Sequence, residues 1–173
     1  MATFYSHRKV ADHTYIEVAG IEFEDFAEGQ IFEHRPGRTF TAEESRLHAI
    51  RSLDLSMRNV DAVYNEKVYG GQAVIGESFL ISVLTALTTK TFGKVVANLG
   101  WTNMQFPVPV HAGDTIYAES EILGKRESAS RPGQGILSVK TRALNQRGGE
   151  VCSFERRILL YKRGQGPYEA AGY

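Results

Sequence analysis

The sequence is poor in cysteine and carries no excess of charge of either sign. Cys152 is the only cysteine among 173 residues, so an intrachain disulfide is impossible and a reducing compartment is expected. Twenty Lys and Arg residues balance twenty Asp and Glu residues. A neutral chain lacks the basic surface that duplex nucleic acid attracts, so we expect no nucleic-acid partner.

Long apolar runs are also missing. No stretch approaches the ~20 apolar residues that cross a membrane, and residues 1–20 lack the apolar centre of a signal peptide. We therefore expect a cytoplasmic protein without membrane association. No metal site is expected either, because metal-ligand spacing is absent among the histidines, which are His7, His13, His34, His48 and His111.

The chain is long enough for one domain, and 42% hydrophobic residues supply its core. Thr41 and Glu44 form a capping-box pattern that predicts a helix running to about Leu53. Residues 54–72 are rich in Asp, Asn and Gly and predict a loop with at most one helical turn. Residues 74–92 are apolar nearly all round and predict a long buried helix.

The rest of the chain has the period of strands. Residues 115–123 and 137–143 alternate between apolar and polar side chains, and 31–40, 95–106 and 150–161 also predict strands. Residues 145–149 predict the hairpin turn between the last two strands. Because the strands follow one another and do not alternate with helices, the pattern indicates an α+β fold with an antiparallel sheet around the buried helix.

Several short motifs carry a resemblance to a known family. They are Val96-Ala97-Asn98-Leu99-Gly100-Trp101, Phe106-Pro107-Val108-Pro109-Val110, Gly113-Asp114-Thr115, residues 126–132 and Leu144-Asn145-Gln146. With the order of elements, these motifs resemble the MaoC-like hydratases and (R)-specific enoyl-CoA hydratases, in the branch that acts on itaconyl-CoA or mesaconyl-CoA type substrates. The resemblance covers roughly residues 22–163.

The resemblance implies a hot-dog fold, in which a curled antiparallel sheet encloses one long helix. It also divides the chain into an N-terminal extension over 1–21, a hot-dog domain over 22–163 and a flexible tail over 164–173. Members of the family line their pockets with two subunits, so a homodimer or a larger oligomer is implied. An exposed sheet edge gives that association a physical basis.

The catalytic signature of these hydratases is Asp-x-Asn-Pro-x-His, followed by Phe-Gly and His-Gly pairs. Residues 54–59 resemble the first part, with Asp54 retained and Asn59 at the His position. Tyr69-Gly70 and Ile75-Gly76 stand at the two pairs. The resemblance implies that Asp54 is the base, that a Gly76 N–H holds the thioester oxygen, and that Tyr69 and Ile75 line the substrate pocket.

Asn59 changes the chemistry, because an amide holds water or a carbonyl but does not titrate near neutral pH. General acid–base help is worth ~10²–10⁴ in rate. Either the activity is weak, or another residue substitutes, or the reaction differs. Glu77, in the first turn of the buried helix, is one residue that could replace the catalytic His. Alternatively, its charge only complements the helix dipole.

Other residues have two interpretations each. Arg58 meets a substrate carboxylate or is a solvated surface residue. Arg126 and Arg131 pair with CoA phosphates or simply keep a loop soluble. His48 on the first helix is interpreted as a surface histidine or a hydrogen-bonded core histidine rather than a catalyst.

Three functions remain open. The first is a hydratase or dehydratase acting on a short or branched enoyl thioester of CoA or an acyl-carrier protein, with no cofactor beyond that substrate. The second is a hot-dog acyl-CoA thioesterase that uses Glu77 or Asp54. The third is an acyl-CoA-binding partner subunit whose catalytic residues have decayed.

Overall fold

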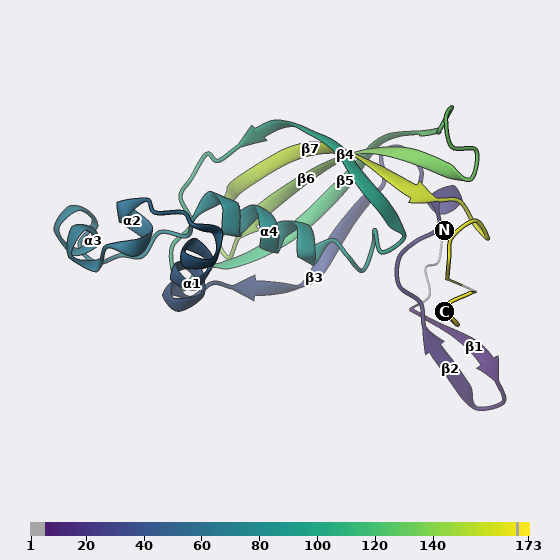
Figure 1. Ribbon diagram of the computed structural model, residues 1–173, viewed down its shortest axis with the longest axis horizontal. Coiled ribbons are helices and arrows are strands. Elements are labelled where there is room, and N and C mark those ends of the chain that lie inside the picture. Colours follow the sequence, from purple (N-terminus) through teal and green to yellow (C-terminus); the bar gives the residue numbers. More distant parts are fainter. Residues whose placement is uncertain (1–5, 169) are drawn as a thin grey trace.

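The computed structural model describes residues 6–168 and 170–173, which form a five-stranded antiparallel sheet with one helix across a face of it (Figure 1). The strand order is β3-β5-β6-β7-β4. The bounds are β3 Ile31–Thr39, β4 Val95–Gln105, β5 Thr115–Glu127, β6 Gln134–Asn145 and β7 Glu150–Tyr161. This is the α+β arrangement that the sequence predicts.

Strands β5 and β6 bury the side chains that the alternation predicts. Ile116, Ala118, Ser120 and Ile122 of β5 are buried, as are the inward residues of β6, which are Leu137, Val139, Thr141 and Ala143. The β6–β7 turn is also confirmed: Gly148 N donates to Asn145 O at 2.9 Å, and Gly148 has the positive φ of 78° that favours glycine.

Helix α1 (Ala42–Ser52) begins with the predicted capping box. The Thr41 hydroxyl accepts from Glu44 N, and the Glu44 carboxylate accepts from Thr41 N. The helix ends at Leu53, which adopts the left-handed conformation with φ 57°. This turn brings Asp54 N within 2.9 Å of Ala49 O and so fixes where the next segment starts.

The expectation of a loop over 54–72 is wrong, because two short helices form there: α2 (Met57–Val60) and α3 (Ala62–Tyr69). The Asp61 side chain caps α3 by accepting from Tyr64 N at 2.9 Å, and Gly70 ends it in the left-handed conformation. The Asp and Gly residues that suggested a loop therefore mark helix ends.

Helix α4 (Glu77–Leu87) is shorter than the predicted 74–92 and is buried on one face only. Leu80 and Leu84 pack against inward residues of β5, β6 and β7, whereas Ser78, Ser82 and Ala86 are exposed. The sheet of one chain covers one side of the helix, so the opposite side meets solvent. A second core cluster lies beyond the end of α4, around Phe26, Phe92 and Ile158.

Residues 7–17 form a hairpin of β1 (His7–Ala11) and β2 (Thr14–Glu17), and the short helix η1 (Phe23–Asp25) follows. In Figure 1 the hairpin and the C-terminal end lie at the opposite end of the molecule from α1, α2 and α3. In the tail, the ring of Tyr168 packs edge-on against Tyr161, with 6.0 Å between ring centroids.

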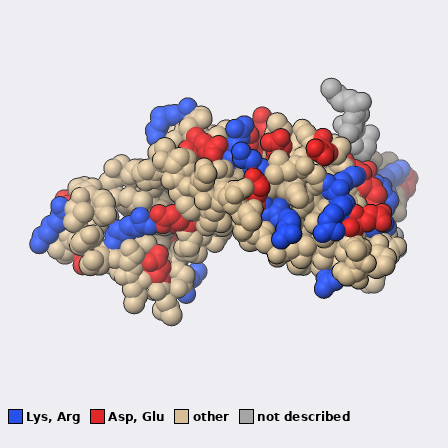
Figure 2. Space-filling model, turned by 90° about the horizontal axis from the view of Figure 1, so that it is seen from above, with Lys and Arg blue, Asp and Glu red and all other residues tan. Residues whose placement is uncertain are grey.

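Positive and negative side chains are interspersed on the face shown in Figure 2, as the zero net charge leads one to expect. Among the described residues, the helices are too short or too polar to span a membrane.

Candidate functional site around the start of helix α4

The start of α4 is held in place from the strand side. Ile75 is 3% exposed, and its N–H donates to Val110 O at 2.8 Å, while Val74 bridges to His111. Gly76 is the N-cap residue and brings no side-chain cap. The first-turn N–H groups of a helix have no intrahelical acceptor, and they carry the positive end of the helix dipole.

Asp54 and Asn59 form a hydrogen-bonded pair beside this helix start. Asn59 Nδ2 donates to Asp54 Oδ2 at 2.9 Å, and Ser56 N donates to Asp54 Oδ1 at 3.1 Å. Both side chains are half-buried. The carboxylate therefore has one orientation, which is set by the turn after α1 and by α2.

The pair contacts Gly76. A Cβ atom at Gly76 would lie 3.5 Å from Asn59 Nδ2 and 3.9 Å from Asp54 Oδ2. Asn59 Oδ1 is buried and lacks a hydrogen-bond partner among the described residues. Such an acceptor normally bonds to a donor, so a water or a ligand donor fits beside it. The structure thus brings together three predicted site residues.

The Gly76 N–H donates to Ser45 Oγ at 3.4 Å. This bond is long, so a stronger acceptor such as a developing oxyanion could replace it. The predicted oxyanion donor, the Gly76 N–H, therefore already has a hydrogen-bond acceptor in this structure. Ser45 lies on α1 and is buried, and its hydroxyl had no role in the expectations from sequence.

Glu77 and Arg58 bind each other across the same helix start. The Arg58 guanidinium donates to the Glu77 carboxylate, and the two side chains are 32% and 45% exposed. The Glu77 carboxylate also lies at the positive end of α4. This arrangement favours the interpretation of Glu77 as a structural charge, and it places Arg58 next to Asp54 and Asn59 in the chain and in space.

Three of the predicted substrate-binding residues lie away from this cluster. Tyr69 ends α3, where its exposed ring packs against Tyr64.

Arg126 ends β5 and Arg131 lies in the turn that follows. Thr115, at the other end of β5, pairs with Thr39 just before α1. At ~3.3 Å per residue, Arg126 is ~36 Å along the strand from that end. Within one chain, these arginines lie far from Asp54, and their pairing with CoA phosphates stays a prediction.

His48 agrees with the expectation of a surface or hydrogen-bonded histidine. It is half-buried, its Nε2 lies 3.2 Å from Ser78 Oγ, and its ring stacks on Phe79. Ser45 and His48 are three residues apart on α1 and face the same turn of α4. That i, i+3 spacing of polar side chains was the available signal in the sequence.

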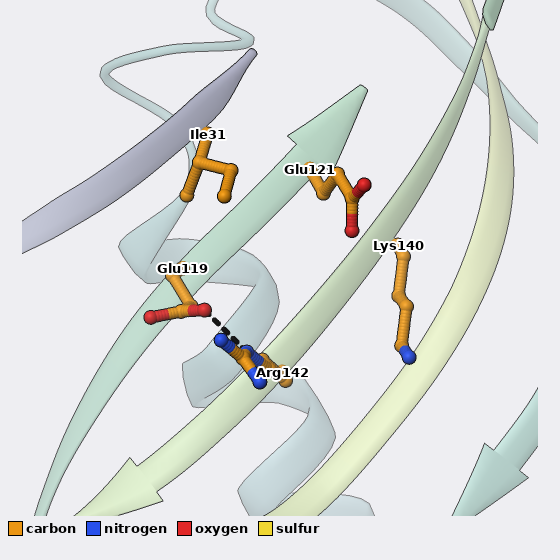
Figure 3. A pocket seen from close by; sticks show the side chains of 5 residues that line it. All are labelled: Ile31, Glu119, Glu121, Lys140 and Arg142. Carbon is orange, nitrogen blue, oxygen red and sulfur yellow. Dashed lines mark hydrogen bonds and ion pairs between the residues drawn. The ribbon is translucent and has the colours of Figure 1, made fainter. Parts of the chain in front are cut away.

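Two hollows lie elsewhere on the molecule. One is on the outer face of the sheet, lined by Ile31, Glu119, Glu121, Lys140 and Arg142 (Figure 3). Its charged side chains come from neighbouring strands, and Glu119 and Arg142 form an ion pair across them. The other lies near the chain ends and includes Glu22, Lys94 and Tyr168. Among the described residues, His, Cys, Asp and Glu do not gather into a group that could hold a metal ion.

Comparison with known proteins identifies the fold and the family. The chain is 32% identical over 155 residues to the mesaconyl-CoA hydratase of Cereibacter sphaeroides, and the match covers 84% of this chain but 42% of that protein. It therefore spans less than half the length of that curated relative.

Solved structures share the architecture. A MaoC-domain dehydratase from Chloroflexus aurantiacus matches with a TM-score of 0.77 at 24% identity, over 85% of this chain and 42% of that one. A Mycobacterium tuberculosis protein with a double hot-dog fold matches with a TM-score of 0.73 at 24% identity, over 86% of this chain and 46% of that one. The predicted hot-dog fold is confirmed. The sequence pattern of the mesaconyl-CoA hydratases matches residues 3–172, and the chain belongs to that family.

Proposed function

We propose that this protein adds water to, or removes it from, the carbon–carbon double bond of a short or branched enoyl-CoA thioester at the start of α4. The family and the curated hydratase relative support the reaction class. The observation that carries the proposal is the Asp54 carboxylate, which lies 3.9 Å from the position of a Cβ atom on Gly76. A base thus stands beside the positive end of a helix.

The roles follow from this geometry. Asp54 takes a proton from a water molecule that the free Asn59 Oδ1 helps to hold. The water oxygen attacks the β-carbon, and negative charge moves to the thioester oxygen. First-turn N–H groups of α4, including that of Gly76, stabilise this oxygen because they and the helix dipole are already oriented toward it.

The Arg58–Glu77 ion pair suggests a substrate that carries a second negative charge. A mesaconyl group has a free carboxylate in addition to its thioester. We propose that this carboxylate competes with Glu77 for the Arg58 guanidinium, because Arg binds planar carboxylates through paired hydrogen bonds. Asn59 stands where the catalytic signature has His, and this substitution leaves the pair with one titrating group in place of two.

We also propose that the protein forms a homodimer through β4. Strand β4 is a sheet edge of eleven residues without a charged side chain, whereas the other edge, β3, contains Glu33, Arg35, Pro36 and Arg38. Charges and proline protect an edge from pairing, so β4 is the edge available to a second copy. Antiparallel pairing of two β4 strands brings the end of one sheet that carries Arg126 and Arg131 beside the α4 start of the other subunit.

The experiment incubates the purified protein with crotonyl-CoA, mesaconyl-CoA and a saturated acyl-CoA. Hydration removes the enone absorbance without releasing free thiol, and we expect it to be fastest with mesaconyl-CoA. Asp54→Asn should lower kcat by ~10²–10⁴, while Asp12→Asn, a change in the exposed β1–β2 turn, should leave it unchanged.

Other outcomes identify the alternatives. Release of free thiol from the saturated thioester would indicate a thioesterase. Thermal stabilisation by CoA esters without turnover would indicate a binding subunit. Full hydration by Asp54→Asn would disprove the role of Asp54.

A further inference from the structure

His48 is fixed at the start of α4 by two contacts. Its Nε2 lies 3.2 Å from the hydroxyl of Ser78, and its ring stacks on Phe79 at 5.0 Å between centroids with an interplanar angle of 25°. The hydrogen bond sets the direction of one ring nitrogen, and the stacking sets the plane of the ring. A half-buried imidazole with both constraints has a single orientation toward α4.

Its hydrogen bond to Ser78 places His48 beside the first turn of α4, next to the Gly76 N-cap. Ser78 is two residues after Gly76, which is ~3 Å along a helix axis. Gly76 in turn contacts Asp54 and Asn59. On the other side, α1 lies against the beginning of α4 (Figure 1), and its Ser45 hydroxyl accepts from Gly76 N. The helix start is thus bordered by a carboxylate pair on one side and by an imidazole on the other.

Adding water to an enoyl thioester requires two proton transfers, one from water to a base and one to the α-carbon. Asp54 provides the first. Asn59 cannot provide the second, because an amide does not titrate near neutral pH. The Arg58 guanidinium is already bound to the Glu77 carboxylate. Imidazole is the side chain that gains and loses a proton between about pH 5 and 8.

We propose that His48 is the second proton-transfer group of the reaction, held by Ser78 and Phe79; this inference rests on the proposed hydration. An O–H bond of water breaks as its proton passes to Asp54, and the water oxygen bonds to the β-carbon. The π electrons move onto the thioester, and their return forms the new C–H bond at the α-carbon. The proton for that bond comes from the Ser78 hydroxyl, which is reprotonated from His48 Nε2. Asp54 then loses its proton to solvent, and His48 regains one.

The test uses three variants of the intact protein with the best enoyl-CoA substrate. His48→Gln keeps an amide that can bond to Ser78 but cannot carry the proton, and we expect kcat to fall by about 10²-fold or more while KM changes less than about threefold. His48→Ala should be equally slow, and added imidazole should restore part of its kcat. His7→Gln, an exposed histidine on β1, is the matched control and should match the wild type.

The failure of this inference differs from the failure of the proposed function. If the wild type hydrates the substrate and His48→Gln keeps a kcat within twofold, then His48 is not a proton-transfer group and the hydration stands. If His48→Ala is slow but imidazole does not restore it, the role of the ring is structural and the inference is wrong.

If the wild type hydrates none of the enoyl-CoA esters, the proposed hydration and the proposed role of His48 are both wrong. Should His48→Gln unfold at a lower temperature than the wild type, Ser78→Ala replaces it as the deciding variant. We expect kcat of Ser78→Ala to fall at least about tenfold, because the relay loses its hydroxyl, and an unchanged kcat would overturn the relay.

Discussion

His34 is a histidine on β3 that the fold keeps neutral. It is 4% exposed, and its two ring nitrogens lie 2.9 Å from Ser120 Oγ and 3.2 Å from Thr91 Oγ1. Burial lowers the pKa of His34 from 6.5 to about 4, and the positive charges of Arg156 and Arg35 add to the effect. The hydrogen bonds satisfy a neutral ring, so the folded protein resists protonation of this residue.

Acid should therefore destabilise the protein through His34. Because the folded-state pKa lies below the unfolded value, the unfolded chain gains a proton first as the pH falls from about 6.5 to about 4. The contribution of His34 to stability is fully present above that window, and it is lost across it. Each pKa unit is worth ~1.4 kcal/mol, so we expect a loss of roughly 3 kcal/mol, measured as the free energy of unfolding in urea at several pH values.

The matched variant is His34→Gln, which keeps polar atoms for Ser120 and Thr91 but cannot titrate. Its free energy of unfolding should change less than that of the wild type between pH 6.5 and 4. Equal slopes for the two proteins would show that other groups cause the acid sensitivity.

Cys152 should be inert in the folded protein. Its side chain is fully buried in β7, and burial raises the pKa of the thiol to about 12, with the charge of Glu150 adding to the rise. The reactive form of cysteine is the thiolate, so both access and ionisation are lacking. We expect no reaction with a thiol-specific chromogenic reagent at pH 8, and one equivalent of reaction after unfolding in urea. Fast labelling of the native protein would contradict the buried position.

At the scale of elements, α4 has a complementary charge at each end. Glu77 lies in its first turn, and Arg156 of β7 reaches its last residues, where Nη2 donates to Thr88 Oγ1 at 2.7 Å. Arg156 is 4% exposed and stacks over Phe92 and Trp101. Burial lowers the pKa of Arg156 to about 10, which leaves it protonated at neutral pH beside the negative end of the helix dipole.

Helix α1 depends on its capping box for a defined start. Thr41→Ala removes the acceptor for Glu44 N and should lower the free energy of unfolding by ~1 kcal/mol. Ser130→Ala at an exposed position of the turn after β5 is the control and should change it by less than ~0.5 kcal/mol. Urea unfolding measures both. A Thr41→Ala protein as stable as the wild type would mean that the cap is not formed in solution.

At the scale of the whole molecule, the elements of the candidate site gather at one end. Helices α1, α2 and α3 and the start of α4 lie together, whereas the β1–β2 hairpin and the C-terminal end lie at the other end (Figure 1). A sheet about 40 Å long separates them, as the 13 residues of β5 imply. One chain therefore carries the candidate site at one end and Arg126 and Arg131 at the distant end.

Pairing through β4 should make the protein a dimer at micromolar concentration. Leu99 is 45% exposed on β4, so Leu99→Glu places two like charges at the interface and should shift the mass in analytical ultracentrifugation toward the monomer. Leu123→Glu on β5 changes a partly exposed leucine away from that edge and serves as the control. A wild type that sediments as a monomer, or a Leu99→Glu variant that remains dimeric, would contradict the pairing.

Local features of the fold could be predicted from the sequence. Period-two alternation identified β5 and β6, the capping box identified the start of α1, and Asn145–Gly149 identified the last turn. The short helices over 57–69 were missed, because Asp61 and Gly70 can mark either a loop or helix ends, and only the helical hydrogen bonds between them distinguish the two.

Part of the candidate site could likewise be predicted from the sequence, and part could not. The sequence by itself determined that Asp54 and Asn59 belong to one short motif and that Gly76 stands at the start of the buried helix, because motifs and periodicity are properties of residues that are close in the chain. The tertiary structure alone decided that Ser45 and His48 face the start of α4 and that Arg58 binds Glu77. It also decided that Arg156 is buried and that Arg126 and Arg131 lie at the far end of the sheet. Those contacts join segments far apart in the chain, and their positions follow from the packing of the whole sheet on α4.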